Sequence, residues 1–231
     1  METEQANTLL NTGIYGIAEA ARLTKVSPGR IRRWIRGLDF RKDLERRPSD
    51  AIWIGALSPM DGKVALGFLD LMEIRFVDAF LRAGVSWRTM KKAHQMGREE
   101  IGSEHPFCTN RFVTDGRRIL LRSAGEDGDE VLRDLVSSQV EFQRIVSPFV
   151  TQLDFTEDSL TRWWPMGRKR NVVVDPARNL GQPTAAQSGV ATEILARGVR
   201  ANESVEKVAA WYEAEPDEVR DAVEFEASLV A

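Results

Sequence analysis

Cysteine and histidine are scarce in this chain of 231 residues, and their scarcity excludes two kinds of stabilising site. The single cysteine, Cys108, has no second thiol in the chain with which to form a disulfide, which fits a reducing cytoplasm. Only His94 and His105 accompany it, and these three side chains are fewer than the four Cys and His ligands of a structural zinc site. We therefore expect no metal and no cofactor.

Long apolar runs and catalytic motifs are missing as well. No apolar stretch approaches the roughly 20 residues that span a bilayer, and residues 1–5 are acidic and polar, unlike a secretory signal. The sequence contains no HExxH pattern and no glycine-rich phosphate loop followed by Lys and Ser or Thr. We expect a cytoplasmic protein that is not an enzyme and has no catalytic residues.

What the chain does have is an uneven distribution of charge. The formal net charge is −3, yet residues 1–123 carry a net charge of +6 and residues 124–231 a net charge of −9. Residues 22–47 alone hold ten basic and three acidic side chains. Such a split indicates that one half of the chain faces an anion and the other half a different partner.

The most basic stretch has the pattern of a helix-turn-helix. Apolar residues recur at helical spacing over 17–21, and the period breaks over 23–26. A second helix is predicted to begin after Ser27 as its N-cap, with Pro28 at its first position, and to end at Gly37. The second helix of such a pair can lie in the major groove of DNA.

This second helix is predicted to bury Ile31, Trp34 and Ile35 and to turn its arginines outward. Attraction to phosphate makes that face a candidate for DNA binding. The alternative is a structural helix pair with a solvated charged face. The predicted DNA contacts are Lys25, Ser27, Arg30, Arg32, Arg33, Arg36, Arg41, Lys42, Arg46 and Arg47.

A β-hairpin of residues 51–54 and 64–66 is expected next, and it would form a wing beside the DNA. Two amphipathic helices are predicted to follow, over 69–81 and over 87–96, the second with Ser86 as its N-cap.

Further elements are expected in the middle of the chain. A second hairpin is predicted over 112–121, turning at Asp115-Gly116. An acidic hinge at 125–130 precedes a connecting helix that ends near Ser147-Pro148. A bend with two tryptophans and a basic triplet occupies 160–170, and a short apolar strand follows at 172–174.

The end of the chain repeats the first helix pair in outline. Seven residues lie 188 positions after their counterparts: Val205, Val208, Ala209, Ala214, Pro216, Val219 and Val223 follow Ile17, Ala20, Ala21, Val26, Pro28, Ile31 and Ile35. The predicted outward face has Glu218, Arg220, Asp221 and Glu224 where the first pair has Arg30, Arg32, Arg33 and Arg36. A phosphate backbone would repel those acids, so we interpret the second pair as a protein-binding or dimerising element.

Residues 15–96, with VSPGRIRRW and FVDAFLRAGVSWRTMKKA, resemble the winged-helix DNA-binding domain of MerR-type regulators. The resemblance implies that Arg30, Arg32 and Arg33 lie at the DNA. The chain departs from MerR proteins after residue 96, because no long dimerising coiled coil with effector ligands follows. A stand-alone MerR-like regulator that responds to a small ligand is the alternative interpretation of the whole chain.

The C-terminal block from VVVDPARNLG to RDAVEFE resembles the small helical domain of unknown function found in bacterial antitoxins encoded beside PIN-like ribonucleases. Together the two resemblances cover most of the chain, and their combination is similar to a VapB-type antitoxin of the VapBC class. They imply a protein that binds and silences a PIN-like ribonuclease toxin and represses its own operon.

The bend at 160–170 is a candidate for toxin binding. A PIN-type nuclease holds divalent metal among carboxylates, so an inserted Arg or Lys can compete with the metal. The triplet Arg168, Lys169 and Arg170 lies beside Trp163 and Trp164, which can anchor an interface. The alternative is that the two tryptophans are core residues at a hinge.

The predicted fold is mainly α with small β-hairpins. A winged helix-turn-helix domain with a second hairpin is expected over 1–123, a linker with the connecting helix and the Trp/Arg bend over 124–170, and a helical domain for toxin binding or dimerisation over 171–231. Because operators are commonly read by two-fold dimers, we expect a homodimer, assembled through residues 131–150 or the C-terminal helices.

Overall fold

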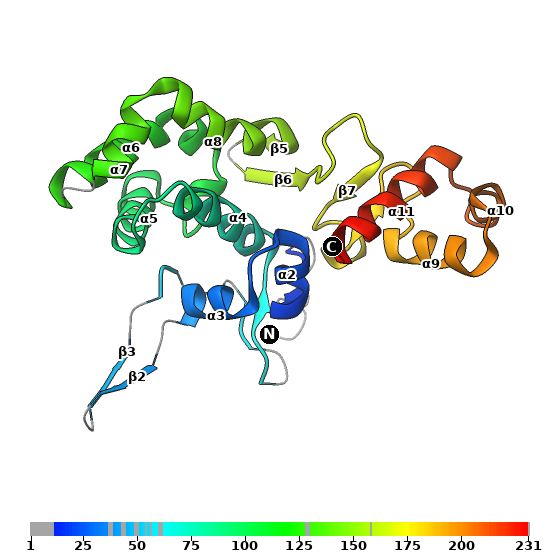
Figure 1. Cartoon of the computed structure of the whole chain (residues 1–231), viewed down its shortest axis with the longest axis horizontal. Coiled ribbons are helices and arrows are strands. Elements are labelled where there is room, and N and C mark those ends of the chain that lie inside the picture. Colours follow the sequence, from blue (N-terminus) through cyan, green and yellow to red (C-terminus); the bar gives the residue numbers. More distant parts are fainter. Residues whose placement is uncertain are drawn as a thin grey trace. The chain divides into compact units, whose positions relative to one another are not determined.

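The structure is a computed structural model, which describes residues 12–36, 39–42, 45–48, 51–53, 55, 57–59, 62–127, 130–157 and 159–230. It is mainly helical with small antiparallel sheets, as predicted. The described chain forms two compact units (Figure 1). The N-terminal unit consists of residues 16–150 and 155–160, and the C-terminal unit of residues 12–15, 151–154 and 161–230.

The N-terminal unit contains most of the helices. They are α2 (Ile17–Thr24), α3 (Pro28–Arg36), α4 (Phe68–Arg82), α5 (Trp87–Ile101), the short 3-10 helix η1 (Pro106–Cys108), α6 (Asn110–Asp127), α7 (Glu130–Ser137) and α8 (Gln139–Gln152), which runs on into the second unit. The short strands in this part are β1 (Tyr15–Gly16), at the boundary of the units, β2 (Asp39–Lys42), β3 (Glu45–Pro48) and β4 (Ala65–Leu66).

Helix α4 supplies the centre of this unit's core. The ring of Phe76 lies 4.8 Å from that of Phe80, 4.5 Å from that of Phe107 and 5.0 Å from that of Phe112, measured between centroids. Aromatic rings bury large apolar areas and gain further from such stacked and edge-on contacts. This cluster joins α4 to η1 and α6.

The C-terminal unit combines a small sheet with three helices. Its elements are β5 (Leu153–Thr156), β6 (Ser159–Trp163), β7 (Val172–Val174), η2 (Asn179–Gly181), β8 (Pro183–Ala185), α9 (Thr192–Asn202), α10 (Val205–Trp211) and α11 (Pro216–Val230), of which β5 and β6 cross the unit boundary. The strands follow the order β5-β6-β7-β8, and β7 pairs antiparallel with both β6 and β8.

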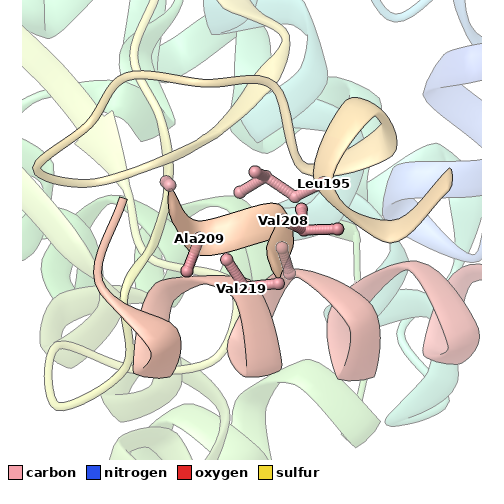
Figure 2. Packing of buried hydrophobic residues seen from close by; sticks show 6 residues of the cluster. Leu195, Val208, Ala209 and Val219 are labelled. Atoms are coloured by element: carbon pink, nitrogen blue, oxygen red, sulfur yellow. The ribbon is translucent and has the colours of Figure 1, made fainter. Parts of the chain in front are cut away.

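The core of this unit lies between its helices. Figure 2 shows Leu195 of α9, Val208 and Ala209 of α10 and Val219 of α11 converging. All four are at least 96% buried, and each large apolar side chain buried in this way stabilises the fold by about 1.5–3 kcal/mol. The predicted second helix pair is therefore present as α10 and α11.

The first helix pair is also present, as α2 and α3 with a turn between them. Ser27 begins α3 as predicted: its hydroxyl accepts a hydrogen bond from Arg30 N at 3.4 Å, and its carbonyl accepts one from Ile31 N at 3.1 Å. The predicted cap at Gly37 lies outside the described residues.

The predicted wing of 51–54 and 64–66 is wrong. Residues 51–53 form no strand, while residue 54 lies outside the described part of the chain. Ile52 and Trp53 are buried, and Ile52 N donates to Trp34 O at 2.9 Å. These residues therefore belong to the core and pack beside α3. A hairpin does occur, formed by β2 and β3, at residues for which no strand was predicted.

The predicted second hairpin over 112–121 is also wrong, because α6 runs through it. The apolar residues Phe112, Ile119 and Leu120 recur at a helical period and are buried. Gly116 lies within the helix because it provides room: a Cβ there would stand 2.8 Å from atoms of the Phe112 ring.

The expected hinge and connecting helix need a smaller correction. Helix α6 continues to Asp127 and α7 begins at Glu130; residues 128 and 129 lie outside the described chain. The connecting helix is divided at Ser138 into α7 and α8, and α8 continues through the exposed Pro148 to Gln152. A proline removes one helical hydrogen bond and so disfavours a helix, but it does not have to end one.

None of the helices in the described part of the chain combines the length and the apolar character needed to cross a bilayer.

Candidate nucleic-acid interface

Helix α3 separates its apolar and cationic residues onto two sides. Ile31 is fully buried, and Trp34 and Ile35 are 2% and 6% exposed. Arg32 and Arg33 are exposed. The helical period places these two groups on opposite sides, so the helix is fixed to the unit by one side and presents arginines to solvent on the other.

Helix α5 extends this cationic surface. The rings of Trp34 and Trp87 stack with centroids 6.0 Å apart, which fixes the start of α5 beside α3. The Arg33 guanidinium lies 5.9 Å from the centroid of the Trp87 ring, a cation–π distance. Arg88, the next residue, is exposed. Arg88 was not among the predicted contacts, although its place at the start of a basic helix was visible in the sequence.

Arg30 has an intramolecular partner. Its Nη1 lies 2.9 Å from Oδ1 of Asp78 on α4, and Arg82 Nε lies 2.6 Å from the other oxygen of the same carboxylate. The Arg30 guanidinium also lies 5.0 Å from the centroid of Trp34. Because Asp78 is only 6% exposed, the two cations compensate for the cost of burying its negative charge. Arg30 therefore anchors α3 to α4, a role that sequence spacing did not indicate.

The remaining predicted DNA contacts lie on the turn before α3, at the end of α3 and on the hairpin after it. Lys25, in the turn, is exposed and has a left-handed backbone conformation. Arg36 is the last residue of α3. The backbone register pairs Arg41 of β2 with Arg46 of β3. Lys42 and Arg47 occupy neighbouring register positions. Figure 1 shows the hairpin extending away from helices α2 to α5.

Behind this surface the N-terminal unit buries a polar cluster. Glu73 accepts a hydrogen bond from Phe107 N at 3.1 Å, and its other oxygen lies 3.7 Å from His94 Nε2. Burial raises the pKa of Glu73 well above its usual value, and the neighbouring Asp70 raises it further. Burial lowers the pKa of His94 to about 3, so its imidazole is uncharged at neutral pH, and burial likewise favours the uncharged form of the Glu73 carboxyl group. Among the described residues no group of His, Cys, Asp or Glu is arranged to hold a metal ion.

In the C-terminal unit the predicted toxin-binding arginines are engaged with their own chain. Arg168 Nη2 donates to Leu153 O at 2.6 Å, and its guanidinium also forms an ion pair with Asp154. Arg170 Nε donates to Asp221 Oδ1 at 2.7 Å, and this arginine also pairs with Glu224. These contacts give both arginines a structural role.

The other three residues of the bend differ in exposure. Trp163 is 4% exposed, while Trp164 is half-buried and its Nε1 donates to Asp154 Oδ2 at 2.8 Å. Lys169 is exposed. Of the three charged residues predicted to bind a toxin, Lys169 is the one without an ion pair in the described part of the chain, and a toxin contact by the bend stays a prediction.

The chain is similar to one curated protein along nearly its whole length. It is 30% identical over 228 residues to a protein of Mycobacterium tuberculosis (strain ATCC 25618 / H37Rv) named "Putative antitoxin VapB45", and the match covers 91% of this chain and 92% of that protein. The chain belongs to the VapB-type antitoxins. It is accordingly a regulatory protein and not an enzyme. The predicted family and the predicted absence of enzymatic activity are confirmed.

A solved structure agrees with this membership. The crystal structure of Rv2018 from Mycobacterium tuberculosis matches the antitoxin with a TM-score of 0.73 and 27% identity, over 93% of this chain and 99% of that one. No family model matches the chain.

The second helix pair of the antitoxin does not have the open face that was predicted for it. Glu218 is 1% exposed and accepts hydrogen bonds from the backbone N–H groups of Gln187 at 2.7 Å and Ser188 at 3.2 Å. Asp221 is 8% exposed and accepts from Asn171 N at 2.8 Å as well as from Arg170. The prediction that Glu218 and Asp221 face outward is wrong, because both carboxylates satisfy N–H donors of the loops that cover α11.

Proposed function

We propose that this VapB-type antitoxin binds the promoter DNA of its own operon through α3 and the β2–β3 hairpin, and that it represses transcription by doing so. The observation that carries the proposal is the exposure of Arg32 and Arg33 on a helix whose opposite side is buried. Guanidinium groups held in this way bind phosphates and base edges of DNA with little further ordering.

The hairpin supports the same proposal. Its strands contain four of the predicted contacts, namely Arg41, Lys42, Arg46 and Arg47, directly after the helix in the chain. A two-stranded arm next to a groove-reading helix reaches the flanking phosphate backbone. Arg30 is paired with Asp78 and fixes the direction of α3, so it acts as a positioning residue in this proposal.

The proposed operator complex contains a homodimer. One helix-turn-helix reads a single half-site, and two-fold symmetric operators require two copies at a fixed spacing. The segment 131–150 and the C-terminal helices are the proposed contact surfaces. Val131 and Val140 are 46% and 67% exposed, which supports the first of these.

The proposed partner of the antitoxin is a toxin of the PIN-like ribonuclease class. Membership of the VapB-type antitoxins supports this assignment over a stand-alone regulator that responds to a small ligand. A simple measurement distinguishes the antitoxin from a stand-alone regulator. The antitoxin should co-purify with the protein encoded next to it, whereas a stand-alone regulator should purify alone from the same operon.

The DNA-binding proposal is tested by fluorescence anisotropy with a labelled duplex of the chain's own promoter. The double variant Arg32→Ala/Arg33→Ala should bind about tenfold more weakly or worse, because each lost contact costs about 1 kcal/mol or more. The matched control Arg200→Ala removes an exposed arginine from α9 and should bind as the wild type does. Equal affinity of the double variant and the wild type would overturn the proposal.

A further inference from the structure

Two large aromatic side chains are exposed at the end of α10. Trp211 is 59% exposed and Tyr212 is 40% exposed. Val208 and Ala209 of the same helix point into the core, whereas Trp211 and Tyr212 do not belong to that core cluster. Tyr212 ends the helix by donating its N–H to Val208 O at 3.1 Å. Exposed aromatic pairs of this kind are typical of surfaces that bind proteins.

Exposed acidic residues are frequent in the chain on either side of these aromatic residues. Between residues 203 and 217 five acidic side chains are exposed, with Lys207 as the single base of that segment: Glu203, Glu206, Glu213, Glu215 and Asp217. Arg220 on α11 pairs with Glu206 at 3.8 Å and also with Asp217. Glu213 and Glu215 follow the two aromatic residues directly in the chain, and neither side chain forms an ion pair among the described residues.

The elements on either side keep this surface in one place. A Cβ on Gly198 of α9 would lie 3.9 Å from Tyr212 Cε2, so the tyrosine ring lies on α9. Glu215 N donates to the buried Glu218 carboxylate at 3.4 Å, which holds the start of α11. Figure 1 shows α10 at the edge of the C-terminal unit. We call Trp211, Tyr212, Glu213 and Glu215 the aromatic–acidic patch.

We propose that the aromatic–acidic patch binds a cationic surface of the toxin, rich in Arg and Lys. Charge complementarity selects this occupant, since the acidic rim attracts cations and repels nucleic acid. The faces of Trp211 and Tyr212 accept an Arg or Lys by cation–π contact, and such contacts strengthen when the partner excludes water. Large rigid aromatic residues also lose little side-chain entropy on binding.

This inference rests on the proposed function, in which the partner is a ribonuclease. An enzyme that cleaves RNA has to attract a polyanion, and it does so with basic grooves. An acidic protein surface that occupies such a groove competes with the RNA for it. The patch therefore offers a second route to inhibition, distinct from insertion of Lys169 among the carboxylates of the active site.

The experiment titrates the purified protein encoded next to the antitoxin in its operon into the full-length chain by isothermal titration calorimetry. Trp211→Ala should weaken binding at least tenfold, or about 1.4 kcal/mol, and leave the thermal unfolding midpoint unchanged, because the side chain is largely in solvent. Trp211→Phe should recover part of the affinity. Glu213→Lys should weaken binding most at low salt, where the charge attraction is strongest.

Three controls separate the outcomes. Leu180→Ala shortens an exposed apolar side chain of the C-terminal unit and Glu99→Lys reverses an exposed acid of the N-terminal unit, and both should bind as the wild type does. Lys169→Glu tests the bend. If Trp211→Ala binds with wild-type affinity, the patch proposal is overturned while the toxin partnership stands. If the wild-type chain does not bind the adjacent protein at all, the proposed partnership fails and the patch proposal fails with it.

Discussion

The two helix pairs of this antitoxin share a pattern of apolar residues but differ in what surrounds them. In α3 the helix side away from the core carries Arg32 and Arg33, and both are exposed. At the positions 188 residues later α11 has Arg220 and Asp221, and Asp221 is buried beneath Arg170. The spacing of apolar residues thus determines that a helix pair forms. The neighbouring loops determine whether its outer side remains open to bind another molecule.

A second contrast concerns buried carboxylates. Glu218 in the C-terminal unit is surrounded by backbone N–H donors, so its charge is hydrogen-bonded. Glu73 in the N-terminal unit accepts one backbone bond and faces His94 with its other oxygen. Hydrogen-bond donors offset the cost of burying a carboxylate, and where they are few, burial raises the pKa of the group, as it does for Glu73.

The largest expected effect comes from Glu218→Ala. The change removes the buried acceptor of three part-buried backbone N–H groups, so we expect the C-terminal unit to lose about 3 kcal/mol of unfolding free energy. Asp217→Ala, one residue earlier and exposed, should change it by less than about 0.5 kcal/mol. Urea unfolding, combined with hydrogen exchange of residues 187–230, measures both. Similar losses for the two variants would show that Glu218 does not hold the loop at 187–188.

The next effect is a dependence of stability on pH that arises from Glu73 and His94. Above the ordinary pKa of 4.5 the unfolded chain loses the Glu73 proton that the folded chain keeps, so stability falls as the pH rises. Below the ordinary pKa of 6.5, His94 binds a proton in the unfolded chain, whereas in the folded chain it stays neutral down to about pH 3. Stability therefore falls as the pH falls. The lowered pKa of His105 acts in the same direction as that of His94. Between about pH 4.5 and 6.5 the slopes from Glu73 and His94 oppose each other, and the contribution of His105 shifts maximal stability toward the upper end of this range.

Glu73→Gln should remove the alkaline side of this profile. The wild type should lose up to about 1.4 kcal/mol per pH unit above pH 6.5, and the variant should not, as measured by urea unfolding at pH 6.5, 7.0 and 7.5, below the range in which the thiol of Cys108 contributes. Glu99→Gln, at an exposed position, should keep the wild-type decline. If stability still declined with rising pH in Glu73→Gln, the decline would come from other titratable groups.

A smaller effect is expected from Arg30→Ala. It removes one of two cations from the buried Asp78 and should destabilise the N-terminal unit by about 1 kcal/mol, since Arg82 remains. Arg32→Ala, two positions away and exposed, should leave stability unchanged within about 0.5 kcal/mol. Thermal unfolding distinguishes the two. If both variants were equally stable, Arg30 would not anchor α3 to α4.

Much of the fold could be predicted from residues close together in the sequence. The start of α3 at Pro28 and the cap at Ser86, whose hydroxyl accepts from Thr89 N at 3.2 Å, follow from local rules. The misplaced hairpins have a physical reason as well. Asp115-Gly116 has the composition of a turn, and only the packing of Phe112 shows why a glycine lies within a helix.

The candidate site was less predictable because its contacts join distant residues. Arg30 meets Asp78 across 48 positions, and Arg170 meets Asp221 across 51. Isolated charged residues are normally exposed, so a rule based on composition assigns Glu218 to the surface. Only the three-dimensional arrangement of N–H donors shows that its burial is favourable.

The most direct test of the proposed DNA surface compares matched arginines of the two helix pairs. Binding to the chain's own promoter duplex is measured over a series of salt concentrations for the wild type, Arg32→Ala and Arg220→Ala. Since each phosphate contact contributes about 0.9 to the slope of log affinity against log salt, Arg32→Ala should flatten the slope by about one unit and Arg220→Ala should leave it unchanged. A wild-type slope and affinity for Arg32→Ala, or an equal loss for Arg220→Ala, would contradict the assignment of DNA binding to α3.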